Sequence, residues 1–235
     1  MNLTIIRLGI RALMGGRRVW LLAALAAVLV LIAMVTRAFV SSEASTVGLQ
    51  TVTFGTFLPL FGLIVGTGVI GPEIDDGSIV HLLAKPLSRH RVVQSKLAVA
   101  VLAIIGFAVV PMVVAAVILG AAARTVVAFG VGALCAGAVY CVLFALLAIV
   151  TRHAVVVGLV YALVWESLVG SFVAGARNLS VQQWALSVTA SIAPDGLVTA
   201  HVGVGLSWVL IVVTFVGATW YAGSRLRGFV LAGDD

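Results

Sequence analysis

Long apolar runs dominate this sequence and limit the folds it can adopt. A helix of about 20 apolar residues crosses the ~30 Å hydrocarbon core of a bilayer, and within lipid only helices and closed barrels satisfy their own backbone groups. The chain contains six such runs, whose ends are defined to within a few residues: 19–40, 52–70, 97–120, 125–150, 154–174 and 200–222. They predict an all-α membrane protein with six transmembrane helices.

Composition leaves little room for anything else. Of the 235 residues, 63% are hydrophobic and 9% are charged, against about 25% charged in ordinary globular domains. We therefore expect a single membrane domain over 1–235 and no soluble catalytic domain. The phosphate-binding motif G-x-x-x-x-G-K-[ST] is absent, so the chain is predicted not to be an enzyme by itself. Its histidines lack metal-ligand spacing, so we expect neither a metal site nor a cofactor bound by this chain.

The distribution of lysine and arginine sets the predicted orientation. These residues gather in the cytoplasmic loops of membrane proteins, so the net charge of +6 is not taken as a sign of nucleic-acid binding. If the N-terminus is cytoplasmic, three of the 14 basic residues fall outside (Arg37, Arg124 and Arg177) and the other eleven fall inside. This bias predicts that both termini and the charged segment 71–96 are cytoplasmic.

Residues 2–18 have two different faces when wound as a helix. Leu3, Ile6 and Ile10 lie on one stripe, and Arg7 and Arg11 lie on another. An apolar face beside an arginine face is typical of a helix lying in the membrane surface, which is the structure we expect here. Ordinary positive flanking of the first span is the alternative.

Segment 71–96 carries seven charged residues between two apolar runs. Pro72 suits the first turn of a new helix, and acidic residues follow at once, where the helix dipole favours negative charge. Pro86 ends that helix. The pattern predicts a short cytoplasmic helix, acidic at its start, that docks into a groove of a partner protein. A solvated loop that only sets topology would explain the basic residues but not the acidic ones.

Two stretches carry a resemblance to a known family. EIDDGS at 73–78, LLAKPLSR at 82–89 and then Lys96 resemble the cytoplasmic loop of ABC-2-type permeases, whose pattern is approximately E-x-E-x-G-T, L-L-x-x-P-V-S-R and a lysine before the next span. Asp75 stands for the second glutamate, Ser78 for the threonine, and Val80 with His81 replaces a more acidic stretch. YALVWESL at 161–168 and LSVQQW at 179–184 resemble a feature of one branch of that family.

The resemblance implies a transport subunit that works with partners. Such a permease pairs with a second permease, identical or homologous, and with two ATP-binding subunits that hold ATP and Mg²⁺. The surface helix would contact the ATPase through Arg7 and Arg11. The ATPase-coupling residues implied by the loop are Glu73, Asp75, Asp76, Gly77, Ser78, His81, Lys85, Pro86, Ser88 and Arg89.

Glu166 is an acidic residue deep within an apolar run, which makes it a functional hypothesis by default. It could line the pathway, bind a cationic substrate or bond to backbone at a helix break; a half-solvated position near the outer face is the alternative. Residues 175–199 could form a short re-entrant or outer-surface helix over the pathway, with Trp184 at the interface. We therefore assign Trp165, Glu166 and Trp184 to the pathway or its outer gate.

Together these patterns predict the permease subunit of an ATP-driven exporter in a prokaryotic plasma membrane. An ATP-independent carrier or channel is the alternative, but that class expects ionisable pairs buried in several spans. A membrane anchor or sensor that only recruits an ATPase is a third possibility. An apolar pathway fits a drug, a lipid or a peptide equally well, so the substrate class is left open.

Overall fold

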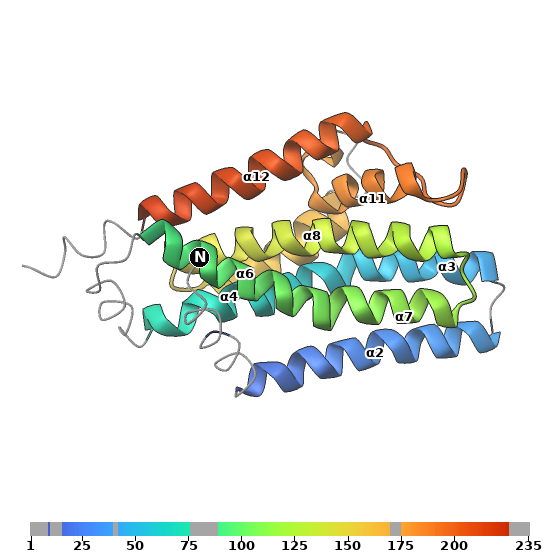
Figure 1. The fold of residues 1–235 in the computed structure, drawn as a ribbon, viewed down its shortest axis with the longest axis horizontal. Coiled ribbons are helices and arrows are strands. Elements are labelled where there is room, and N and C mark those ends of the chain that lie inside the picture. Colours follow the sequence, from blue (N-terminus) through green and yellow to red (C-terminus); the bar gives the residue numbers. More distant parts are fainter. Residues whose placement is uncertain (1–8, 10–15, 40–41, 76–88, 170–174, 226–235) are drawn as a thin grey trace, which may run out of the picture.

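The computed structural model describes residues 9, 16–39, 42–75, 89–169 and 175–225. Over these ranges the chain is helical without any β-strand, which confirms the all-α prediction. Figure 1 shows the long helices running side by side. The helices are α2 (Arg17–Phe39), α3 (Ser42–Val52), η1 (Thr53–Phe57), α4 (Leu58–Asp75), α6 (Arg89–Ile104), η2 (Ile105–Val109), α7 (Val110–Ile118), α8 (Ala123–Val150), α9 (Ala154–Val160), η3 (Tyr161–Val169), η4 (Arg177–Leu179), α11 (Val181–Ile192) and α12 (Val204–Arg225).

Five of the six predicted spans appear as helices long and apolar enough to cross a membrane. Their apolar stretches are Arg18–Phe39, Val47–Gly71, Val92–Ile118, Ala123–Val150 and Val204–Arg225. The run at 154–174 corresponds to α9 and η3, whose apolar stretch Ala154–Glu166 is shorter. The chain is therefore a multi-pass helical protein, and the sixth crossing stays a prediction.

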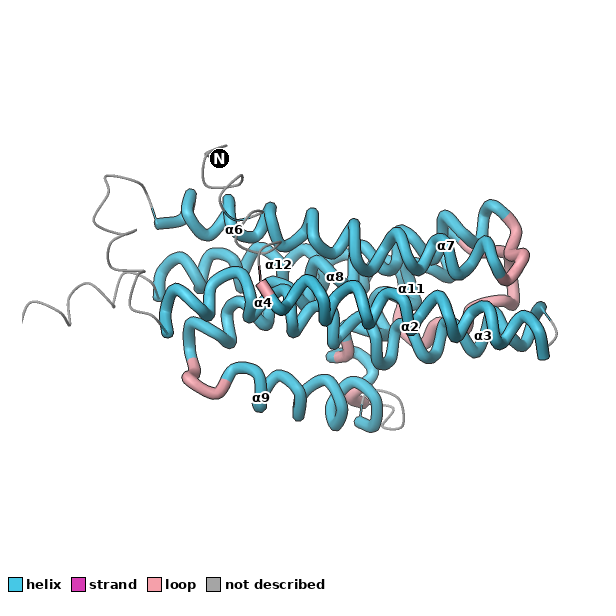
Figure 2. Tube along the Cα trace, turned by 90° about the horizontal axis from the view of Figure 1, so that it is seen from below, coloured by secondary structure: helices cyan, strands magenta, loops and turns pink. Residues whose placement is uncertain are grey.

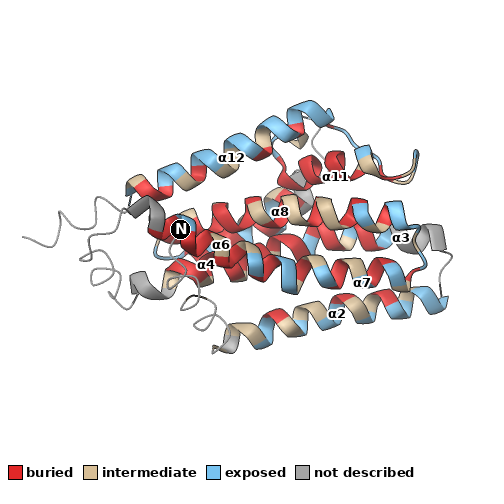
Figure 3. Cartoon of the chain, in the orientation of Figure 1, coloured by how far each residue is buried: buried red, intermediate tan, exposed pale blue. Residues whose placement is uncertain are grey.

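Helix α8 lies at the centre of the bundle. It packs against α4, α11, α12, α7 and α6, and α4 is its most extensive partner. The span containing α4 is 72% buried, whereas the spans formed by α2 and α12 are each 17% buried. Figure 3 shows these two helices on opposite sides of the bundle, with exposed residues along both. Their exposed residues include Trp20 and Trp220, which suits contact with lipid.

Glycines let α4 and α8 approach closely. At Gly62 an added Cβ would collide with the Cβ of Tyr140. At Gly66 it would lie 2.7 Å from the carbonyl oxygen of Cys141 and 2.9 Å from the Cβ of Phe144. The GxxxG spacing in this span therefore serves packing within the bundle, as small residues commonly do in membrane helices.

The helix ends alternate between the two ends of the bundle. One end holds the starts of α2, α6 and α9 and the ends of α4, α8 and α12, as Figures 1 and 2 show. The basic residues Arg18, Lys96, Arg152 and Arg225 belong to these helix ends, and Arg37 and Arg124 belong to the opposite ends of α2 and α8. This asymmetry fits the predicted sidedness, which itself stays a prediction. Arg7 and Arg11 lie outside the described residues.

Two of the prolines within helices coincide with π-helical segments. A proline has no N–H, so the carbonyl four residues earlier loses its intrahelical donor. For Pro59 that carbonyl belongs to Gly55, within η1, and for Pro111 it belongs to Phe107, within η2. The wider π turns adjust the backbone at these positions.

The predicted start of a new helix at Pro72 is wrong. Helix α4 continues without a break from Leu58 to Asp75, so Pro72, Glu73 and Asp75 belong to its last turns. The prediction failed because it assumed that the lost donor of Pro72 would end the helix. The carbonyl that this donor would have served finds another partner, the guanidinium of Arg18.

Candidate functional site

A short buried helix, α11, lies beside α8 and α12, toward the end of the bundle opposite the end of α4 and the start of α6 (Figure 1). It begins after Ser180, whose hydroxyl accepts a hydrogen bond from the backbone N–H of Gln183 at 3.3 Å. Serine is among the preferred residues at this capping position. The helix is buried from Val181 to Thr189. The expected short helix within 175–199 is therefore present, and it lies inside the bundle.

The carboxylate of Glu166 holds the start of α11. Its Oε1 accepts hydrogen bonds from the Tyr161 hydroxyl at 2.8 Å and the Val181 N–H at 3.1 Å. Its Oε2 accepts from the Ser180 hydroxyl at 2.6 Å and the Gln182 N–H at 3.2 Å. Each oxygen thus receives one hydroxyl and one backbone donor. Glu166 itself comes from η3, so one side chain joins the two segments that flank residues 170–180.

This bonding decides between the roles predicted for Glu166. The side chain has 0% exposure, so the half-solvated alternative is wrong. Four donors occupy the roughly four acceptor positions that a carboxylate offers, and the N-terminus of α11 adds a favourable dipole. Bonding to backbone at a helix break is therefore the role that the structure shows. A role in the pathway or its gate stays a prediction.

Two tryptophans bind the residues just before this cap. The indole N–H of Trp184 donates to the carbonyl of Asn178 at 2.9 Å, and that of Trp165 lies 3.5 Å from the carbonyl of Leu179. Together with the Glu166 contacts, these bonds give each residue from 178 to 182 a hydrogen bond to Trp165, Glu166 or Trp184. The side chain of Trp184 is 5% exposed and its N–H is satisfied inside the bundle, so it packs within the protein. Its position at the membrane interface stays a prediction.

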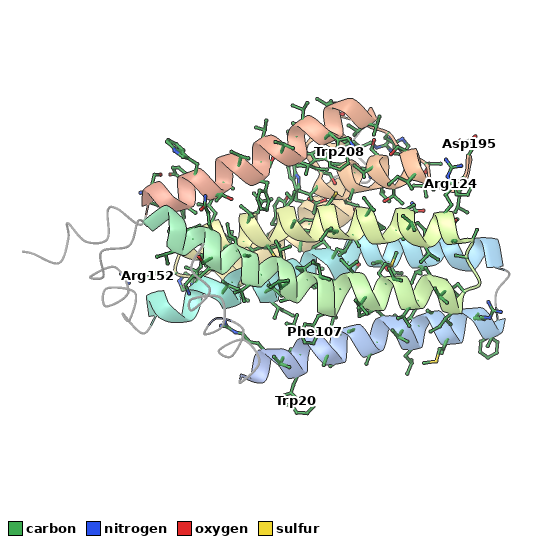
Figure 4. The ribbon with its side chains drawn as sticks, in the orientation of Figure 1. Trp20, Phe107, Arg124, Arg152, Asp195 and Trp208 are labelled. Atoms are coloured by element: carbon green, nitrogen blue, oxygen red, sulfur yellow. The ribbon has the colours of Figure 1, made fainter. Side chains whose placement is uncertain are left out.

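A residue that was not assigned to the site holds the other end of α11. The Nε of Arg124, at the start of α8, donates to the carbonyl of Ile192 at 2.6 Å. A cation at a helix C-terminus complements the dipole. Figure 4 shows Arg124 beside Asp195, which follows α11. In the sequence, Arg124 stands out only as a basic residue in the short connection between two apolar runs. Counting lysines and arginines assigned it to the outer side but gave it no role.

Several other polar atoms are buried around the start of α11. Within the described ranges, the hydroxyls of Thr53 and Tyr140 and the side-chain carbonyls of Gln182 and Gln183 have no hydrogen-bond partner. Thr53 belongs to η1, which contacts both α11 and η3. The Tyr140 ring stacks on Phe144. Two π-helical segments and the start of α11 therefore meet in a polar region inside an apolar bundle, and π segments are frequent at functional sites.

The predicted coupling residues lie almost wholly beyond what the structure describes. Glu73 and Asp75 belong to the last turns of α4 and Arg89 begins α6, but their side chains are not among those described. Outside the described residues altogether are Asp76, Gly77, Ser78, His81, Lys85, Pro86 and Ser88. Closer to the core, Arg18 and Lys96 bind two carbonyls of α4, those of Gly68 and Val69.

Comparison with known families decides the assignment. The family model described as "ABC-2 family transporter protein" matches residues 16–176, well over half of the chain. The chain belongs to this family. The match includes α2, α4, the segment 71–96, α8 and Glu166, whereas α11 and α12 follow it. A search of curated proteins gave no match.

Membership confirms the resemblance drawn from the loop and from the stretch around Glu166. This ABC-2 protein is a multi-pass membrane permease of the ABC transporter class, a transport subunit rather than an ATPase. The family implies an ABC ATP-binding subunit as partner. Among the described residues, no three histidine, cysteine, aspartate or glutamate side chains come together as a metal site would require.

Proposed function

We propose that this permease forms half of the transmembrane pathway of an ATP-driven exporter in a prokaryotic plasma membrane. A second permease, identical or homologous, supplies the other half, and two ATP-binding subunits supply ATP and Mg²⁺. The family match over 16–176 carries this proposal. The exposed apolar sides of α2 and α12 support it. Because so little of these two helices is buried within the chain, their surfaces can contact both lipid and a second permease.

The partner ATPase docks on segment 71–96. In this proposal the loop from Glu73 to Arg89 enters a cleft of the ATP-binding subunit, and the N-terminal helix adds contacts through Arg7 and Arg11. Hydrolysis then displaces the loop and with it the ends of α4 and α6. The support is chemical: acidic and basic side chains gather here between helices that are otherwise apolar.

Co-purification tests this assignment directly. The tagged chain is extracted gently from its native membrane, and the proteins that accompany it are identified. A stoichiometric ATPase that carries a Walker motif and is lost when 73–89 is replaced by a Gly/Ser linker would support both the function and the docking site. A chain that purifies alone, repeatedly and intact, would favour an ATP-independent carrier or channel instead.

A single substitution tests the coupling role of Glu73. The change Glu73→Ala removes one carboxylate from the end of α4, so we expect a folded complex without stimulated ATP hydrolysis. The matched control is Asp195→Ala, which removes an exposed carboxylate at the opposite end of the bundle. Unchanged hydrolysis in the reconstituted Glu73→Ala complex would remove Glu73 from the coupling contact.

The same exporter needs an outer gate, which we assign to α11. Trp165 and Glu166 from η3 bind residues 179–182, and Arg124 binds the far end of α11, so movement of α11 as a unit requires these bonds to break. A membrane anchor that only recruits an ATPase has no need for a buried helix bonded at both ends. The bonding of α11 therefore favours a transport role over a purely sensory one.

Thiol labelling tests the gate without knowledge of the substrate. Ala185, fully buried on α11, is changed to cysteine in a chain whose own cysteines, Cys135 and Cys141, are changed to alanine. We expect a membrane-impermeant maleimide to label Ala185→Cys only when ATP is supplied to the complex. Thr199→Cys, in the exposed outer connection, is the control that is labelled throughout. If Ala185→Cys is labelled to the same extent with and without ATP, α11 does not move in response to ATP and the gate assignment is refuted.

A further inference from the structure

Pro72 differs from the other two prolines within helices. Pro59 and Pro111 each follow a π-helical segment that contains the carbonyl left without its donor. At Pro72 no such segment occurs: residues 58–75 form one α-helix, α4. The carbonyl of Gly68, four residues before Pro72, therefore lacks its regular α-helical donor, and a half-buried carbonyl without a partner is costly inside a membrane protein.

Arg18 supplies the missing donor. Its guanidinium Nη1, from the start of α2, lies 2.9 Å from the Gly68 carbonyl oxygen. The glycine makes the approach possible, since a Cβ at this position would lie 3.0 Å from that nitrogen and 3.4 Å from the Arg18 Cδ. A positive charge near the C-terminal end of α4 is also favourable for the helix dipole. The arginine thus replaces the N–H that Pro72 lacks.

Lys96 binds the next carbonyl along the helix. Its Nζ, from α6, lies 2.8 Å from the carbonyl oxygen of Val69. The Lys96 residue is 7% exposed, so protein groups such as the Val69 carbonyl, rather than water, surround its charge. Two adjacent carbonyls of α4 are therefore bound by cations from two other helices, α2 and α6.

We propose that Arg18 and Lys96 are positioning residues that tie the end of α4 to α2 and α6, so that these helices move together when the loop 76–88 is displaced. The coupling part of this inference rests on the proposed function. The clamp itself does not: it needs only that Arg18 substitutes for the donor missing at Pro72.

A double-mutant cycle tests the clamp. Pro72→Ala restores a backbone N–H for the Gly68 carbonyl, so Arg18 should lose much of its importance. We expect Arg18→Met to lower the folded-to-unfolded ratio about tenfold in the natural chain, the size of one charge-assisted hydrogen bond, and less than about threefold with Pro72→Ala present. The assay follows the denaturant dependence of thiol reaction at Cys141, which is fully buried, in a Cys135→Ser chain.

Two controls separate the hydrogen bond from charge. Arg152→Met removes an exposed positive charge at the same end of the bundle and should give no coupling with Pro72→Ala. Arg18→Lys keeps a donor and should recover part of the lost stability. Equal losses from Arg18→Met in both proline backgrounds, or equal coupling for Arg152→Met, would overturn the clamp.

A separate measurement tests the role in coupling. In the complex with its ATPase, Arg18→Met and Lys96→Met should still hydrolyse ATP but lose the ATP-dependent labelling of Ala185→Cys. Full ATP-dependent labelling in both variants would refute the transmission role even if the cycle succeeds. If no ATPase accompanies the chain, the coupling role fails with the proposed function, and the cycle still decides whether the clamp exists.

Discussion

Replacing Glu166 with glutamine tests a buried carboxylate that accepts four hydrogen bonds. The two side chains have nearly the same shape, but glutamine has one acceptor oxygen where glutamate has two. Since each carboxylate oxygen accepts one hydroxyl and one backbone N–H, either orientation of the amide loses one bond of each kind. The hydroxyl can rotate toward another acceptor, whereas the backbone N–H at the start of α11 points at the new NH₂ group.

The expected loss follows from these two bonds. Hydrogen bonds to charged groups contribute about 1.5–3 kcal/mol each, although bonds between membrane helices average nearer 0.6 kcal/mol. Loss of the negative charge at the N-terminus of α11 removes up to ~2 kcal/mol more in a buried geometry. We therefore expect Glu166→Gln to lower the free energy of unfolding by about 2–4 kcal/mol, which reduces the folded-to-unfolded ratio by at least roughly 30-fold.

Reaction of the buried Cys141 thiol measures this loss. Its side chain is fully buried, so in a Cys135→Ser chain a thiol-reactive dye reports unfolding as denaturant is raised. Asp195→Asn is the matched control, because it makes the same chemical change at an exposed residue. If the two variants unfold at the same denaturant concentration, the four hydrogen bonds do not stabilise the start of α11 and the assignment of its anchor is wrong.

Four further substitutions test other contacts of the bundle, each measured by the same thiol assay. Gly62→Ala should destabilise by about 1–3 kcal/mol because its Cβ meets α8, whereas Gly106→Ala, with open space around it, should be neutral or stabilising. Arg124→Met should lower the free energy of unfolding by about 0.3–1 kcal/mol, the usual size of an exposed interaction between a cation and the C-terminal end of a helix dipole. Ser180→Ala should cost about 1–3 kcal/mol, because it removes both a cap and a donor.

Apolar patterning predicted the spans well because a lipid-crossing helix depends on a long run of side chains of one kind. Its errors lie where other contacts decide. The second helical stretch begins at Ser42, ten residues before the predicted run at 52–70. Its first part is polar, so apolar patterning did not detect it, although polar residues such as Thr51 can stay in a helix by bonding their hydroxyls to the preceding turn. Pro72 was taken as a helix start because local signals carry no information about Arg18, whose bond to the Gly68 carbonyl spans fifty residues of sequence.

The residues that the sequence analysis assigned to the pathway or its gate show the same limit. Trp165, Glu166 and Trp184 were selected for their chemistry, and the structure brings all three to residues 178–182. Which backbone groups they bind depends on the path of the chain between η3 and α11. Arg124 was missed because its partner, Ile192, lies 68 residues away, so no spacing within the sequence could connect them.

Four charged side chains share one physical role in this bundle. Arg18, Lys96 and Arg124 donate to backbone carbonyls, and Glu166 accepts from backbone N–H groups. The Glu166 and Arg124 contacts lie at the two ends of α11, and the Arg18 contact reaches the carbonyl whose helical donor Pro72 lacks. The Lys96 contact reaches the next carbonyl along α4. Inside lipid, where water is absent, side chains must satisfy the backbone groups that a helix leaves unpaired. Because each of these four contacts also joins two segments of the chain, we expect the residues that complete the backbone bonding to carry movement from one helix to the next.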